Sequence, residues 1–157
     1  MPAPVLSLRV LATTDLHCAL LPWDYFTDRP IKGQGLAQLA PVIRRMRAEA
    51  PNTLLFDNGD MVQGNPMADV AASVAFDGPH PMIAAMSALG YDAAAIGNHE
   101  FDYGLPFLRR VIDQSDFPFV CANLYRVGGG MVFASEVLLS RHMRDNCHIP
   151  EGSMAVS

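Results

Sequence analysis

Carboxylate, imidazole and amide side chains occur in three short motifs within the first hundred residues of the chain. Asp15 and His17 are separated by one residue, so in an extended segment their side chains point to the same side. Asp60 follows Gly59, which permits a tight turn, and the two oxygens of its carboxylate can bridge two ions. Asn98 offers a neutral amide oxygen. Because nitrogen and oxygen ligands together suit a divalent transition-type ion, Asp15, His17, Asp60 and Asn98 are the candidate metal ligands.

His99 and Asp102 form a candidate acid–base pair beside the third motif. The imidazole of His99 can exchange a proton near neutral pH, and Asp102, three residues later, is close enough to orient it. An isolated Asp-x-His or Gly-Asp pair is common and is usually structural. The run from Gly97 to Glu100 is sharper, because average composition gives it by chance in about one chain in a thousand of this length.

Each of the three motifs follows a short apolar segment that reads as a β-strand. The predicted strands are residues 8–13, 53–56, 93–96 and 119–122. A helix is predicted from the spacing of Leu36, Leu39, Ile43 and Met46, with Arg44, Arg45, Arg47 and Glu49 turned outward, and it ends before Pro51. Further helices are predicted at residues 66–75, 80–89 and 105–114, and a loop at residues 24–35.

Strands that alternate with helices predict an α/β fold with mostly parallel strands. Asp15, Asp60, Asn98 and Asn123 each fall just past the end of a predicted strand. In open α/β sheets, ligand sites lie along the carboxyl ends of the strands. We therefore expect these polar residues, which are far apart in sequence, to meet at one edge of the sheet.

The remaining histidines and the sulfur-containing residues match no metal or cofactor motif. The histidines outside the motifs, His80, His142 and His148, are expected at the surface. Four methionines, Met61, Met67, Met82 and Met86, are expected to fill the core. The three cysteines follow no CxxC spacing, so neither a disulfide framework nor a zinc ribbon is indicated, and Cys18 is expected to be a buried free thiol rather than a metal ligand.

Composition excludes several classes of protein. The 157 residues are 50% hydrophobic and 17% charged, which is typical of a globular domain. A formal charge of −5 and the absence of a Lys/Arg run argue against a nucleic-acid partner, and no apolar run reaches membrane-spanning length. Since the start has no basic segment before an apolar stretch, no signal peptide is expected and the chain as it stands is placed in the cytoplasm. The oligomeric state is not determined by these observations.

The three motifs resemble those of the calcineurin-like metallophosphatase superfamily. Asp15-x-His17, Gly59-Asp60 and residues 97–100 look like its first three signature blocks, and residues 97–104 resemble the 5′-nucleotidase branch. Residues 24–30 and 57–66 look most like the bifunctional 2′,3′-cyclic-nucleotide 2′-phosphodiesterase/3′-nucleotidase subgroup. The resemblance extends from about residue 8 to about residue 123.

This resemblance implies a hydrolase with the first half of a metallophosphatase β-sandwich flanked by helices. It implies two divalent metal ions, with Zn, Mn, Co, Fe and Mg not distinguishable, and a small nucleotide as substrate. By resemblance, Asp15, His17 and Asp60 bind one ion, while Asp60 and Asn98 bind the second. A water activated by both ions would hydrolyse the phosphate ester, and His99, oriented by Asp102, would protonate the leaving sugar oxygen. Members of the subgroup are often periplasmic.

The family's later blocks, a lone His and a Gly-His-x-His block, have no match after Asn123. We therefore expect residues 1–140 to form the N-terminal part of a catalytic domain and residues 141–157 to be a poorly ordered tail. Three functions remain open: an active phosphoesterase of the cyclic-nucleotide or the 5′-nucleotidase type, a catalytically inactive fragment of such an enzyme, and a nucleotide-binding module without metal. The lack of a Gly-rich phosphate loop counts against the last.

Overall fold

A parallel four-stranded sheet is the centre of the fold. The computed structural model describes residues 7–121. The strands, in their order across the sheet, are β1 (Arg9–Thr13), β4 (Thr53–Asp57), β5 (Ala93–Ala95) and β6 (Phe119–Val120). Every neighbouring pair is parallel. The predicted α/β fold is thus confirmed, whereas the predicted tail at residues 141–157 and Asn123 lie outside the described residues.

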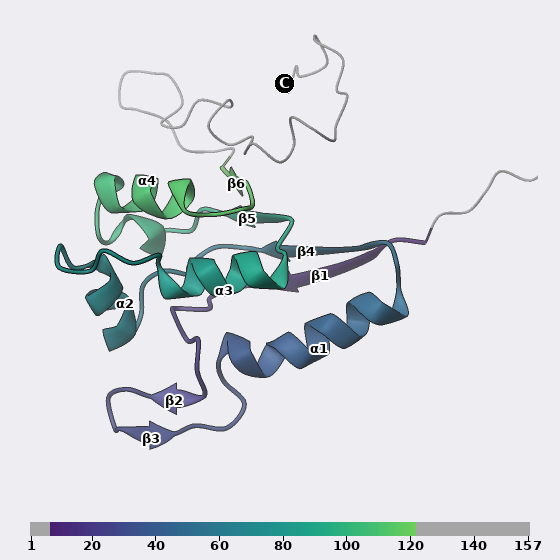
Figure 1. Ribbon diagram of the computed structural model, residues 1–157, viewed down its shortest axis with the longest axis horizontal. Helices are drawn as coiled ribbons and strands as arrows, with labels where there is room; N and C mark the ends of the chain where they lie inside the picture. Colours follow the sequence, from purple (N-terminus) through teal and green to yellow (C-terminus); the bar gives the residue numbers. More distant parts are fainter. Residues whose placement is uncertain (1–6, 122–157) are drawn as a thin grey trace, which may run out of the picture.

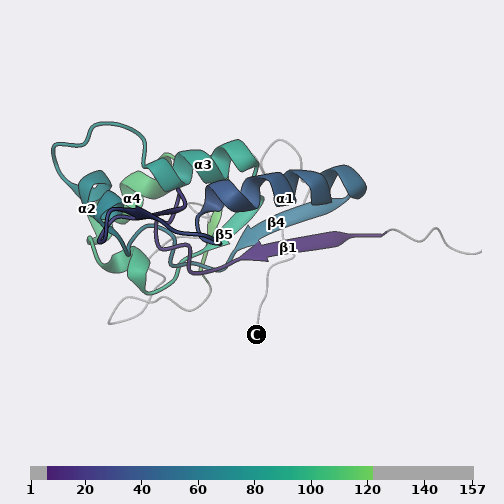
Figure 2. The ribbon, with the colours of Figure 1, turned by 90° about the horizontal axis from the view of Figure 1, so that it is seen from below.

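Helices connect the strands and cover one face of the sheet. The α-helices among residues 7–121 are α1 (Leu36–Glu49), α2 (Pro66–Ala72), α3 (Pro81–Leu89) and α4 (Leu105–Asp113) (Figure 1). The short 3₁₀ turn η1 (His99–Phe101) follows β5. Figure 2 shows α1 and α3 side by side along one face of β1 and β4. No described helix has the length and hydropathy needed to cross a membrane.

The core is built between α3 and the sheet. α3 is among the most deeply buried helices, with Met82, Ile83 and Met86 fully inaccessible to solvent. Met61 is also fully buried and Met67 packs against the same cluster, so the predicted core role of the methionines is confirmed.

α3 ends where the sequence predicts, because Gly90 takes a left-handed conformation (φ 68°) at the C-cap. The Arg47 guanidinium of α1 donates hydrogen bonds to the carbonyls of Leu89 and Gly90. It also lies 3.5 Å from the carboxylate of Asp92. The sequence predicted that Arg47 points outward into solvent, and this was wrong. The unpaired carbonyls at the end of α3 attract its positive charge instead.

The buried side of α1 differs from the predicted one. Leu36 and Ile43 are buried, but Leu39 is 41% exposed. Ala40, one position further along the helix, packs against the core instead. The period of 3.6 residues allowed either Leu39 or Ala40 to face inward, and only the close approach of α1 to α3 decides between them.

Residues 24–35 were expected to form a loop, but part of this segment is a small antiparallel ribbon. Its two strands, β2 (Trp23–Asp24) and β3 (Arg29–Pro30), pair with each other. The carboxylate of Asp24 accepts the backbone N–H of Phe26 at 2.9 Å and the hydroxyl of Thr27 at 2.6 Å. This local side-chain bonding closes the turn between the strands.

His80 is buried, and the prediction that it lies at the surface was wrong. Only 2% of the residue is exposed, and its ring meets Phe107 edge to face at a centroid distance of 5.7 Å. Neither ring nitrogen has a hydrogen-bond partner among residues 7–121. Burial, reinforced by the nearby Arg110 guanidinium, lowers the pKa of His80 from 6.5 to about 4. His142 and His148 lie outside the described residues.

None of the helices among the described residues covers the opposite face of the sheet (Figure 2). Val10 of β1 is 55% exposed and Val120 of β6 is 48% exposed. Val10 is paired in register with Leu54, and Ala12 with Phe56.

Candidate metal centre

Asp15, His17 and Asp60 form a cluster in which one ligand atom from each lies within 4.8 Å of the others. Asp15 and His17 follow β1, and Asp60 follows β4. The parallel register pairs Thr13 with Asp57, which brings the ends of these two strands together. Two carboxylates and one imidazole are a donor set that suits a divalent ion such as Zn²⁺ or Mn²⁺, so the residues fit the metal that the sequence predicts.

The segments that follow β1 and β4 continue side by side beyond the sheet. Asp15 donates its backbone N–H to Gly59 at 3.0 Å, and His17 donates to Asp60 at 2.9 Å. All three cluster residues have left-handed backbone conformations, with φ of 53° for Asp15, 46° for His17 and 61° for Asp60. Such conformations are uncommon outside glycine and are concentrated at functional sites, where the surroundings must stabilise them.

The His17 imidazole is held in one orientation. Its Nδ1 lies 2.8 Å from the carbonyl oxygen of Gln63. A carbonyl can only accept, so Nδ1 is the donor of this hydrogen bond and Nε2 is the ring atom left for a ligand. Nε2 lies 3.7 Å from Asp15 Oδ1, on the side where an ion would bind. Gly64 makes this packing possible, because a Cβ there would lie 2.6 Å from the Cβ of His17.

The Asp60 carboxylate is fixed by the turn that follows β5. Its Oδ1 accepts the backbone N–H of His99 at 2.9 Å. A Cβ added at Gly97 would lie 2.3 Å from the same oxygen, and one added at Gly59 would lie 2.6 Å from the nitrogen of Gly97. The two glycines therefore let the turns after β4 and β5 touch directly.

Asn98 is exposed and lies between Gly97 and the first residue of η1, which it precedes as the N-cap. Its carbonyl accepts the N–H of Phe101 at 3.3 Å, while the hydrogen bonds of residues 7–121 include none to its side-chain amide. Asn98 thus lies on the same turn that contacts Asp60, and its role as a ligand of a second ion stays a prediction.

His99 and Asp102 form a pair beside the cluster. His99 Nδ1 lies 2.8 Å from Asp102 Oδ2, and both residues lie on or next to η1. The hydrogen bond that the imidazole of His99 donates to Asp102 is the main cause that raises the pKa of His99 above 6.5. The rings of His17 and His99 are 5.3 Å apart between centroids, so His99 stands next to the candidate metal ligands.

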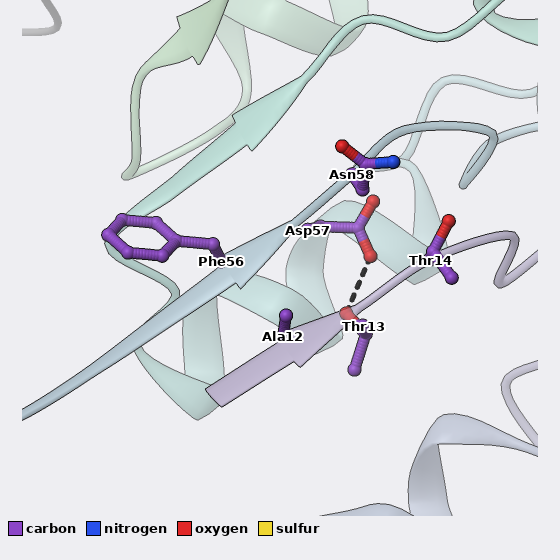
Figure 3. A pocket seen from close by; sticks show the side chains of 6 residues that line it. All are labelled: Ala12, Thr13, Thr14, Phe56, Asp57 and Asn58. Carbon is purple, nitrogen blue, oxygen red and sulfur yellow. Dashed lines mark hydrogen bonds between the residues drawn. The ribbon is translucent and has the colours of Figure 1, made fainter. Parts of the chain in front are cut away.

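Asp57 is a buried carboxylate that the sequence pattern did not single out. It accepts the hydroxyl of Thr13 at 2.6 Å and the N–H of Gly59 at 2.9 Å, so it shapes the turn that presents Asp60. Burial raises the pKa of Asp57 to about 6. Figure 3 shows its side chain pointing toward Thr13 from the neighbouring strand. These residues border a hollow at the ends of β1 and β4, lined by Ala12, Thr13, Thr14, Phe56, Asp57 and Asn58.

Cys18 follows the cluster in sequence but is fully buried. Burial raises the pKa of its thiol to about 12, which disfavours the thiolate that a metal would need. The prediction of a buried thiol is confirmed.

Comparison with known proteins identifies the family of the chain. The family model described as calcineurin-like phosphoesterase matches residues 8–147. The trifunctional nucleotide phosphoesterase protein YfkN of Bacillus subtilis is 42% identical over 149 residues, which are 91% of this chain and 10% of that protein. The 2′,3′-cyclic-nucleotide 2′-phosphodiesterase/3′-nucleotidase of Haemophilus influenzae is 43% identical over 77% of this chain and 19% of its own length.

The crystal structure of calcineurin-like phosphoesterase YfkN from Bacillus subtilis has the same arrangement, with a TM-score of 0.77 and 44% identity. The match covers 81% of this chain and 40% of that one. The chain thus spans only a fraction of the length of these relatives. The chain belongs to the calcineurin-like phosphoesterase family, in the branch that contains the 5′-nucleotidases and the 2′,3′-cyclic-nucleotide 2′-phosphodiesterase/3′-nucleotidases.

Proposed function

We propose that this chain acts in the metal-dependent hydrolysis of nucleotide phosphate esters, as a 2′,3′-cyclic-nucleotide 2′-phosphodiesterase/3′-nucleotidase. The observation that carries the proposal is the cluster of Asp15, His17 and Asp60 next to the His99–Asp102 pair. The similarity to the Haemophilus influenzae protein supports this choice of substrate.

Asp15, His17 and Asp60 would hold one divalent ion, and Asp60 with Asn98 would hold the second. When bound, such ions supply Lewis-acid charge for the phosphoryl oxygens and lower the pKa of a water molecule. The chain's own residues prepare this position. Gln63 fixes the imidazole of His17, and the N–H of His99 fixes one oxygen of Asp60.

His99 would act on the leaving group. Its Nδ1 is bonded to Asp102, so Nε2 is the atom free to give a proton to the sugar oxygen as the phosphorus–oxygen bond breaks. Asp102 favours the protonated imidazole and keeps its orientation. With a 2′,3′-cyclic nucleotide, addition of one water breaks the bond to the 2′ oxygen and leaves a 3′-phosphate. A second water releases inorganic phosphate and the nucleoside.

The experiment is a substrate comparison with the purified chain in excess Mn²⁺. We expect cleavage of 2′,3′-cyclic AMP and 3′-AMP in preference to 5′-AMP, and loss of cleavage when EDTA is added. Preference for 5′-AMP would favour the 5′-nucleotidase type. Mn²⁺ binding without turnover would favour the inactive alternative, and turnover that survives EDTA would refute a metal-dependent reaction.

A further inference from the structure

Glu100 is fully buried, and its carboxylate accepts hydrogen bonds from four backbone N–H groups. Oε1 accepts from Met61 at 2.7 Å and from Val62 at 3.3 Å. Oε2 accepts from Asp60 at 2.8 Å and from Gly97 at 2.7 Å. Both oxygens are thus fully used.

The four donors belong to two different turns. Asp60, Met61 and Val62 follow β4, whereas Gly97 follows β5. Oε2 alone connects the two turns, since it accepts one N–H from each. The connection reaches the nitrogen of Asp60, the same residue whose φ of 61° is left-handed. A conformation of this kind persists only where neighbouring contacts impose it.

We propose that Glu100 is a positioning residue for the metal centre. Glu100 fixes the turn after β4 to the turn after β5, and this holds Asp60 at its distance from His17. This inference rests on the proposed function, because it assigns Glu100 an effect on metal affinity. Glu100 does not itself contact the ion or the substrate, as its oxygens face four N–H groups.

The geometry explains why a glutamate is needed. Glutamine has the same length, but it replaces one acceptor oxygen with an NH₂ group that would face two N–H donors. Two buried N–H groups would then lack a partner, and this is costly. Aspartate keeps the charge but is shorter by one methylene group, so its oxygens would retreat from both turns.

The first test is calorimetric titration of the full 157-residue chain with Mn²⁺, comparing Glu100→Gln with Asp92→Asn. Asp92 is a matched control, because its carboxylate also accepts a backbone N–H, that of Leu55 at 2.7 Å, but at the amino end of β5. We expect Glu100→Gln to weaken Mn²⁺ binding about 10–100-fold, which is typical when a residue that orients a metal ligand is replaced. Asp92→Asn should leave it within about twofold.

Urea unfolding of both variants identifies any effect of general destabilisation, so affinities are compared under conditions in which each variant is fully folded. Unchanged affinity in Glu100→Gln would overturn the proposal, and so would equal losses in the two variants. If Glu100→Gln does not fold, Glu100→Asp takes its place, with the same expectation.

The second test is amide hydrogen exchange in the unmodified chain. The N–H groups of Asp60, Met61 and Gly97 should be protected although none lies in a helix or strand. Exchange as fast as in an exposed turn would overturn the role of Glu100. If the unmodified chain binds no Mn²⁺, the metal centre itself is refuted, while the exchange rates still decide whether Glu100 joins the two turns.

Discussion

His99 Nδ1 lies 2.8 Å from Asp102 Oδ2, and the His99 ring stands 5.3 Å from the ring of His17 between centroids. The first contact joins His99 to a carboxylate, and the second places it beside the candidate ligands without making it one of them. The backbone of His99 also contributes, since its N–H binds Asp60. Side chain and main chain of one residue thus have separate tasks, and substitution can separate them.

Replacing His99 with alanine should lower turnover of a 2′,3′-cyclic nucleotide by about 10²–10⁴-fold, because the proton donor is lost. The affinity for Mn²⁺ should stay the same, since the alanine backbone keeps its bond to Asp60. Steady-state kinetics and calorimetry measure the two effects. A variant that loses Mn²⁺ together with activity would show that His99 is a ligand.

Replacing Asp60 with alanine should reduce Mn²⁺ affinity more than replacing Asn98. Asp60 belongs to the three-residue cluster and is proposed to bridge both ions, whereas Asn98 would contact one. For Asp60→Ala we expect Mn²⁺ affinity to fall by more than the factor of about 10–100 that is typical when a residue hydrogen-bonded to a metal ligand is replaced. Titration calorimetry of both variants tests the ranking, with Asp113→Ala, an exposed carboxylate on α4, as control. Equal losses at positions 60 and 98 would contradict a bridging role.

Gly97→Ala should displace the Asp60 carboxylate. The new Cβ would lie 2.3 Å from Asp60 Oδ1, a distance that real atoms do not tolerate. Gly78→Ala is the control, because there the nearest atom is the movable ring of Phe76 at 3.1 Å. Mn²⁺ affinity should fall clearly in Gly97→Ala and remain unchanged in Gly78→Ala. If both variants bind Mn²⁺ like the unmodified chain, the contact between the two turns is not important for the site.

The buried His80 predicts a pH dependence of stability in the metal-free chain. In the unfolded chain the imidazole of His80 has a pKa of 6.5, whereas in the folded chain its pKa is about 4. Between these values the unfolded state binds more protons, so this residue lowers stability as the pH falls, by about 2 kcal/mol at pH 5. His80→Leu should remove this loss. Asp57, whose pKa is raised to about 6, acts in the opposite direction, because its folded form takes up the proton first.

Urea unfolding at pH 7 and pH 5 measures the effect. The unmodified chain should be slightly less stable at pH 5, since the contributions of His80 and Asp57 partly cancel. His80→Leu should become more stable at pH 5 than at pH 7, and Asp57→Asn should lose more stability than the unmodified chain. A parallel decline of all three proteins would mean that neither residue causes the pH dependence.

The sequence was sufficient to predict the order of strands and helices because the buried strands are short apolar runs bounded by polar turns. It was not sufficient for features that depend on distant partners. The ribbon of β2 and β3 depends on how Asp24 folds back onto Phe26 and Thr27. The position of His80 depends on the end of α4, because the backbone N–H of His80 donates a hydrogen bond to the side chain of Gln114 at 2.9 Å. The ring nitrogens of His80 form no hydrogen bond with any of the described residues.

In the candidate site, too, some features could be predicted from the sequence and others could not. Asp15 and Asp60 could be placed at one edge because the carboxyl ends of parallel strands meet there. Glu100 was visible only as part of a motif, since its partners are backbone N–H groups, which every residue except proline has. Residue types reveal the groups that would touch an ion, whereas the turn conformations that orient them appear only in three dimensions.

The cluster joins β1 to β4, two strands whose register pairs Thr13 with Asp57. In the unfolded chain these segments are separated by some forty residues, so the cluster exists only when both strands are paired. An ion that it binds therefore favours the folded chain by mass action, by about 2.7 kcal/mol when the free ion is at 100 times its dissociation constant. The melting temperature should accordingly rise with Mn²⁺ concentration, and this rise would report assembly of the sheet without any substrate.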